Sequence, residues 1–138
     1  MGGVATVCVE VVVGLPAQVV WEAVADVGAV HRRLLPGRVA DARIEGDTRI
    51  LTMPDGSRIR ELILATDHDL RRLAYAVVEG QRLPLTYHHA SFQVFDHPAG
   101  SRLVWLTDVL PHAMAGQVRA RVERAIVEIG AALEQHGG

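Results

Sequence analysis

Three ring-bearing side chains that could do acid–base or metal chemistry stand side by side in the stretch TYHHASFQVF: Tyr87, His88 and His89. The alternation of apolar residues after them is typical of a β-strand, in which consecutive side chains point to opposite faces. His88 then shares the more apolar face with Phe92, whereas Tyr87 and His89 point outward. The pattern predicts one inward histidine, as a candidate acid–base group or as a hydrogen-bonded core residue.

A carboxylate has a similar placement in the stretch SRIRELILA. Alternation puts Arg58 and Arg60 on one face, which we expect to meet water. Ile59, Glu61 and Ile63 then point to the interior. There the carboxylate of Glu61 could accept a hydrogen bond from a ligand or act as a general base. The alternatives are a hydrated strand end or an ion pair with an arginine.

The seven histidines do not predict a metal site. His88 and His89 point to opposite faces, and the other five fall in turns or near helix ends. No His-x-His pair or cysteine cluster has the spacing of metal ligands. The glycine motifs that bind nucleotides and the G-x-S-x-G nucleophile elbow are also absent. We therefore expect neither a metal nor a cofactor.

Length and composition indicate one domain over residues 1–138, with an ordered core of about 4–135. The net charge of −2 does not favour nucleic acid as a partner. Glu10 interrupts the first apolar stretch, so we expect neither a signal peptide nor membrane insertion. The only cysteine, Cys8, excludes a disulfide framework, favours a cytoplasmic protein, and has apolar neighbours that predict its burial.

The periodicity predicts an α+β fold. The expected elements are a strand at 4–14, helices at 17–26 and 28–37, strands at 38–46, 48–53, 57–66, 70–79, 86–96 and 101–109, and a helix from about 112 to 135. The short turns between the six later strands indicate an antiparallel meander. The last helix has a continuous apolar stripe, which a curved sheet can cover while leaving a pocket between them.

Three segments, PAQVVWEAVAD, LTMPDGSRIRELILATD and RRLAYAVVEGQRLP, precede the long helix in this order and resemble the START/Bet v 1-like (SRPBCC) superfamily. The chain is most similar to its bacterial polyketide cyclase/dehydrase and lipid-transport group. The resemblance implies a helix-grip fold, a seven-stranded antiparallel sheet wrapped round the C-terminal helix, with a hydrophobic cavity between them. The superfamily includes aromatase/cyclases, lipid carriers and hormone receptors, so the resemblance does not imply one activity.

The resemblance also bears on individual positions. Similar proteins often carry an acidic residue where Glu61 stands. In similar hormone receptors, loops corresponding to 52–57 and 80–84 close the cavity, although both can equally be ordinary hairpin turns. The residues expected to act there are Met53, Pro54 and Leu83. Counting from Pro84 places His88 where similar proteins often have a tyrosine, so a role of that tyrosine does not carry over.

Combining strand parity, helix spacing and these loops predicts a set of ligand-binding residues. They are Met53, Ile59, Glu61, Ile63, Tyr75, Val77, Leu83, His88, Phe92, Leu103, Trp105, Thr107, Val118, Val122 and Ile126. Three of them, Glu61, His88 and Tyr75, are candidate catalytic groups.

Three functions remain open from the sequence. The first is binding of a hydrophobic small molecule, such as a lipid, polyketide or isoprenoid, by a carrier or sensor. The second is a cyclase or dehydratase that folds its substrate in a shaped pocket and uses one acid–base group. The third is a homodimeric interaction module with a vestigial cavity, for which Val104 and Leu106 on the outward face provide an apolar surface.

Overall fold

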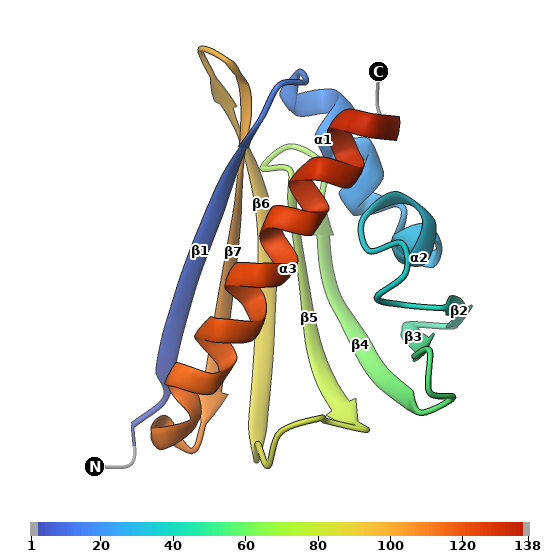
Figure 1. Ribbon diagram of the computed structural model, residues 1–138, viewed down its shortest axis with the longest axis vertical. Coiled ribbons are helices and arrows are strands. Elements are labelled where there is room, and N and C mark those ends of the chain that lie inside the picture. The colour runs from blue at the N-terminus through green and yellow to red at the C-terminus, as the bar shows by residue number, and fades with distance from the viewer. Residues whose placement is uncertain (1–2, 137–138) are drawn as a thin grey trace.

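The computed structural model of the protein describes residues 3–136 (Figure 1). Its first elements are β1 (Ala5–Val13), α1 (Ala17–Ala25), the 3₁₀ turn η1 (Val27–Ala29) and the single helical turn α2 (Val30–Arg33). The later strands are β2 (Asp41–Glu45), β3 (Thr48–Thr52), β4 (Arg58–Asp67), β5 (Arg72–Glu79), β6 (Tyr87–His97) and β7 (Gly100–Leu110). The last elements are the 3₁₀ turn η2 (His112–Met114) and the long helix α3 (Ala115–His136).

All seven strands belong to one antiparallel sheet, in the order β1-β7-β6-β5-β4-β3-β2. The first strand pairs with the last, so that Ala5 lies opposite Val109 and Val13 lies opposite Ser101. The α3 helix runs diagonally across the concave face, and α1 and α2 lie beside its C-terminal half (Figure 1). The predicted α+β helix-grip fold is confirmed.

The expected elements differ from the observed ones mainly at their ends. The helix expected at 28–37 is only a 3₁₀ turn and one helical turn, which ends at Arg33. Pro36 disfavours helical backbone at the residue before it, and Gly37 has a positive φ of 83°. The strand expected at 38–46 is correspondingly reduced to Asp41–Glu45. The last helix begins at Ala115, because residues 112–114 form a separate 3₁₀ turn.

Strand alternation places the core as the sequence predicts. On β7, Leu103 and Thr107 are buried, whereas Leu106 is 40% exposed on the other face. On β5, the inward residues Tyr75 and Val77 are buried. The face assignments made from sequence parity are therefore correct for these two strands.

The α3 helix approaches the sheet most closely near its C-terminal end. A Cβ atom added at Gly130 would lie 3.0 Å from a methyl carbon of Val11, so the helix packs tightly on β1 at this glycine. Beyond it, the carboxylate of Glu134 accepts a hydrogen bond of 2.6 Å from the backbone N–H of Gly14. These contacts fix one end of α3 against the sheet.

The convex face of the sheet contains a residue whose predicted burial is wrong. Cys8 is exposed, because it alternates with the buried Val7 and Val9 and so points away from the helices. Val12 and Leu106 are also exposed on this face. Homodimerisation through it stays a prediction.

We expect Leu103→Ala to lower the free energy of unfolding by about 2–5 kcal/mol, because a fully buried side chain leaves a cavity in the core. Leu106→Ala, the same change on the other face of β7, should cost less than about 1 kcal/mol. Urea unfolding followed by circular dichroism measures both. Equal losses in the two variants would contradict the face assignment of β7.

Candidate functional site

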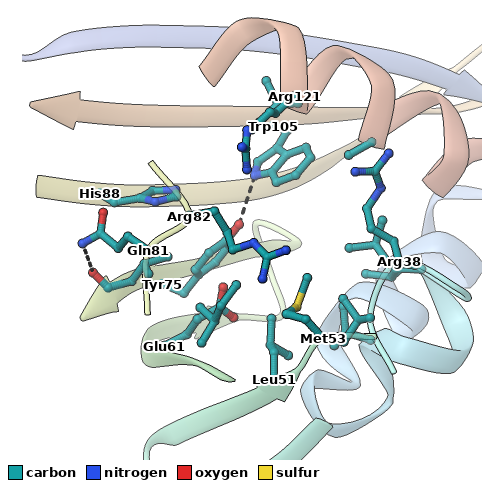
Figure 2. Close-up of a pocket in the computed structure, with 18 of the residues that line it drawn as sticks. Arg38, Leu51, Met53, Glu61, Tyr75, Gln81, Arg82, His88, Trp105 and Arg121 are labelled. Atoms are coloured by element: carbon teal, nitrogen blue, oxygen red, sulfur yellow. Dashed lines mark hydrogen bonds between the residues drawn. The ribbon is translucent and has the colours of Figure 1, made fainter. Parts of the chain in front are cut away.

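A cavity of about 200 Å³ lies between the concave face of the sheet and the N-terminal half of α3. Strands β3 to β7 supply its walls on one side, and α3 supplies Val118, Val122 and Ala125 on the other. The segment around α2 and the loop between β5 and β6 complete it (Figure 2). The cavity is thus formed where α3 stands away from the sheet.

Three aromatic side chains from neighbouring strands form a stack in the cavity wall. The ring of Phe92 stacks on Trp105 with centroids 4.6 Å apart and on Tyr75 with centroids 6.3 Å apart. The indole N–H of Trp105 donates a hydrogen bond of 3.2 Å to the hydroxyl oxygen of Tyr75 (Figure 2). Such rings offer a flat apolar surface with a polar group at its edge.

A buried ion pair lies beside this stack. Arg49 on β3 stands directly opposite Glu61 on β4, and both side chains are almost fully buried. The Nε atom of Arg49 donates a hydrogen bond of 2.8 Å to the carboxylate oxygen Oε1 of Glu61, and Nη2 lies 2.7 Å from the same oxygen. Within residues 3–136 the second oxygen, Oε2, has no hydrogen-bond partner. Arg49 also donates to the backbone oxygen of Val27, at 3.3 Å.

Tyr75 lies between the ion pair and the indole. The guanidinium carbon of Arg49 is 5.4 Å from the centre of its ring. Burial raises the pKa of Tyr75 well above its ordinary value, and the charge of Glu61 raises it further. The phenol therefore stays protonated, and because Trp105 donates to its oxygen, its own proton is available to an acceptor in the cavity.

His88 and Gln81 lie together at another part of the wall (Figure 2). Burial, with a smaller contribution from His89, lowers the pKa of His88 to about 4, so the imidazole is neutral at pH 7. The side-chain nitrogen of Gln81 donates to the backbone oxygen of Val77 at 3.4 Å, which orients the amide. Its Oε1 atom is buried and has no partner among the described residues. This part of the cavity therefore offers an unpaired acceptor beside a neutral imidazole.

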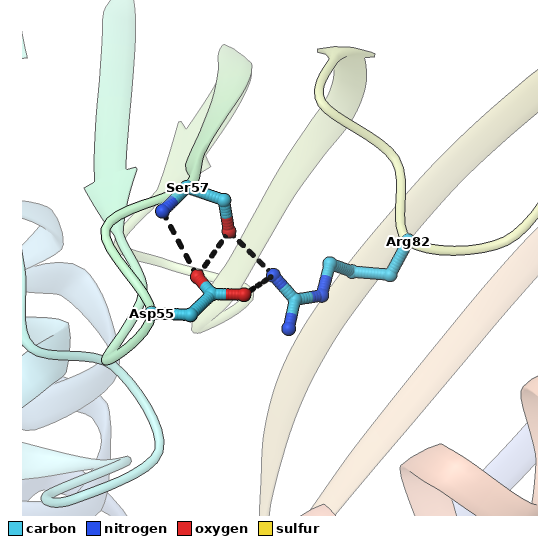
Figure 3. Close-up of polar contacts among 3 residues, drawn as sticks. All are labelled: Asp55, Ser57 and Arg82. Carbon is cyan, nitrogen blue, oxygen red and sulfur yellow. Dashed lines mark hydrogen bonds and ion pairs between the residues drawn. The ribbon is translucent and has the colours of Figure 1, made fainter.

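Charged side chains gather where the lining reaches solvent. Arg82, in the loop between β5 and β6, donates to Asp55 and Ser57 in the loop between β3 and β4 (Figure 3). Hydrogen bonds from Ser57, and less so Arg82, keep the pKa of Asp55 below its usual range. The turn before Arg82 needs Gly80, whose φ is 79° and where a Cβ would lie 2.0 Å from a backbone oxygen of β4.

The structure brings most of the predicted ligand-binding residues to this one cavity. Those that line it are Met53, Ile59, Glu61, Tyr75, Val77, Leu83, His88, Phe92, Trp105, Val118 and Val122. Those that do not are Ile63, Leu103, Thr107 and Ile126. All four point inward as predicted, the first three from strands and Ile126 from α3. However, Ile63 is packed against the core, and the other three are buried within it. Alternation gives the face of a residue, and not whether neighbours cover it. Pro54, expected beside Met53, also does not line the cavity.

The sequence prediction missed four arginines of the lining: Arg38, Arg49, Arg82 and Arg121. For two of them, the sequence pattern contains a signal that could have placed them in the lining. Arg49 shares strand parity with the apolar Leu51, which places a charge on the inner face. Arg121 is three residues after Val118, at the edge of the apolar stripe of α3. For the two loop arginines, no periodicity exists that could have located them.

Two kinds of site have no support in the described part of the chain. Between residues 3 and 136, no three His, Cys, Asp or Glu side chains are grouped so that they could hold a metal ion. In the same residues, no helix has both the length and the apolarity needed to cross a bilayer.

Comparison with known proteins decides the family. A family model described as "polyketide cyclase / dehydrase and lipid transport" matches residues 4–135. The chain belongs to this family. The match confirms the predicted placement in the START/Bet v 1-like superfamily, and no curated protein matches the chain.

Solved structures of low sequence identity share the fold of this family member. The protein XoxI from Bacillus cereus is 19% identical, with a TM-score of 0.76 over 98% of this chain and 94% of that one. A protein from Bacillus thuringiensis is 20% identical, with a TM-score of 0.73 over 97% of each chain. The protein Ara h 8.0201 is 18% identical, with a TM-score of 0.72 over 98% of each chain.

Because the Arg49–Glu61 pair is buried, we expect breaking it to destabilise the fold far more than breaking an exposed ion pair. Arg49→Met leaves the Glu61 carboxylate buried without a counter-charge, so we expect the free energy of unfolding to fall by about 3–5 kcal/mol. Arg102→Gln, which removes the exposed pair with Glu10, should cost at most about 1 kcal/mol. Chemical denaturation measures both, and equal losses would refute a structural role for the buried pair.

His88 predicts a pH dependence of stability. Its pKa is about 4 in the folded chain against an ordinary 6.5, so the unfolded chain takes up the proton first as pH falls. The stability that neutral His88 contributes is therefore present above pH 6.5 and is lost between about 6.5 and 4. His88→Gln should flatten unfolding free energy against pH in this window, whereas exposed His136→Gln should not. An NMR titration of His88 with a midpoint above 6 would contradict this environment.

Proposed function

We propose that this family member binds a compact hydrophobic small molecule in the cavity, as a carrier or a sensor. The observation that supports it is an apolar cavity, already formed, into which a few polar atoms converge. Such a combination is typical of small-molecule sites. The family description includes both lipid transport and cyclase/dehydrase members, so it is compatible with binding without selecting a ligand.

The size of the cavity favours a compact ligand over a long-chain lipid. Its volume of about 200 Å³ is below the roughly 300–1,000 Å³ of pockets for drug-sized ligands. The flat stack of Phe92 and Trp105 favours a molecule with one or two rings, which can lie against it.

Polar atoms of the lining that have hydrogen-bonding capacity left determine which functional groups the ligand should carry. Glu61 Oε2 and Gln81 Oε1 could each accept a hydrogen bond from a ligand, and the Tyr75 hydroxyl could donate one. A ligand hydroxyl could donate to either acceptor, and a ligand hydroxyl or carbonyl oxygen could accept from Tyr75, whereas a ligand without polar groups would leave all three unpaired. Unpaired buried polar groups cost about 1–3 kcal/mol each, which gives the site a basis for specificity.

A cyclase or dehydratase activity is the second candidate, because Glu61, Tyr75 and His88 line the same cavity. Three features favour binding over it. Arg49 engages the carboxylate of Glu61 through two nitrogens. In addition, the raised pKa of Tyr75 makes it a weak acid. His88 is neutral at pH 7, but its lowered pKa of about 4 makes it a weak base.

Filling the cavity tests the proposal. Ala125 lines the cavity on α3, and we expect Ala125→Leu to occupy that space and to abolish the rise in melting temperature caused by a compact probe such as 2-naphthol. In the wild-type protein, a probe at about 100 times its Kd should stabilise the fold by about 2.7 kcal/mol. Differential scanning fluorimetry measures the shift.

Val127→Leu is the matched control, because Val127 is on the same helix but 65% exposed. It should retain the wild-type shift. Binding would be refuted if no compact apolar compound, including 2-naphthol, shifted the wild-type protein, and the cavity would be the wrong site if Ala125→Leu bound the probe as well as the control.

A further inference from the structure

The charges of the cavity lining are unlike those of the chain as a whole. The chain has a net charge of −2. In the described residues, the lining has four arginines and one carboxylate, Glu61, which Arg49 neutralises. The remaining three, Arg38, Arg82 and Arg121, come from three different parts of the chain. Arg38 and Arg82 pair with Glu128 and Asp55, which lie outside the lining, so Arg121 supplies the one uncompensated positive charge among the described lining residues.

These three arginines line the cavity from different sides (Figure 2), and we call them the arginine rim. Arg82 and Arg121 are exposed, and Arg38 is half-buried. Arg38 reaches the rim from the segment after α2, Arg82 from the loop between β5 and β6, and Arg121 from α3.

Ion pairs within the protein orient two of these side chains and leave donors unused. Arg38 donates to both oxygens of Glu128 through Nε and Nη2, so Nη1 is left over. Arg82 uses only Nη1, for Asp55 and Ser57, so Nε and Nη2 are left over. A guanidinium held in this way loses little further freedom when it binds a ligand.

Arg121 differs from the other two, because it has no ion pair or hydrogen bond to any residue between 3 and 136. It lies one position before Val122, which faces the cavity, and so places a full positive charge beside the opening. An uncompensated cation beside a wall of low polarity attracts anions more strongly than the same cation on an open surface.

We propose that the ligand carries one carboxylate, which the arginine rim binds while the apolar body lies against the aromatic stack inside. This inference rests on the proposed function and specifies its ligand class. A planar carboxylate matches the fork of two N–H groups that a guanidinium presents. Because the rim stands at the opening, the anionic group stays hydrated on one side and is not fully buried.

Two probes that share a ring system separate charge from shape: 2-naphthoate, which is anionic, and 2-naphthamide, which is neutral and of similar shape. We expect naphthoate to bind roughly tenfold more tightly at low salt. Raising NaCl from about 0.02 M to about 0.5 M shortens the Debye length from roughly 20 Å to roughly 4 Å, so this preference should shrink. Isothermal titration calorimetry measures both affinities.

Two variants on α3 test whether the arginine rim causes the preference for naphthoate over naphthamide. Arg121→Gln should weaken naphthoate binding about three- to tenfold and leave naphthamide binding unchanged. Arg124→Gln is the matched control, because Arg124 is on the same helix, is exposed and does not line the cavity. It should leave both affinities unchanged.

The possible outcomes separate this inference from the proposed function. Equal binding of the two probes by the wild-type protein would overturn the carboxylate inference and leave the proposed function standing, and so would equal effects of Arg121→Gln and Arg124→Gln. Failure of both probes to bind would count against the proposed function itself. A third probe, 2-naphthyl phosphate, tests the kind of anion, and tighter binding of phosphate than of naphthoate would overturn the assignment to a carboxylate.

Discussion

The close contact of α3 with one edge of the sheet is the constraint on which the rest of the structure depends. Gly130 allows the helix to pack directly on Val11 of β1, and Glu134 holds it to the turn after that strand. Because the sheet curves and the helix is straight, contact at one end leaves space under the other. The cavity is thus a geometric result of where the helix is fixed.

A second constraint is electrostatic and lies within the sheet. Arg49 and Glu61 face each other on β3 and β4, and Arg49 also reaches the backbone of η1. Two buried charges are costly unless each satisfies the other. Their pairing links η1 to the wall of the cavity and leaves one carboxylate oxygen unengaged. One structural interaction therefore also provides a polar atom of the site.

Most of the fold and part of the site could be predicted from the sequence, for physical reasons. Strand parity placed Glu61, Tyr75 and Trp105 on the inner face, because alternation is a property of the backbone alone. It could not separate Trp105, which lines the cavity, from Leu103, which is covered by the core. That difference depends on packing between elements distant in sequence. The exposed Cys8 shows the same limit, since apolar neighbours indicate a strand but not its buried face.

The link between Arg82, Asp55 and Ser57 joins the two loops beside the opening (Figure 3). All of these side chains are exposed, and exposed ion pairs of this kind contribute little to stability. The two loops can therefore separate without disturbing the buried ion pair or the aromatic stack. Under the proposed function, affinity and residence time would have different structural origins, because the cavity wall would determine the first and a weak surface contact would limit the second.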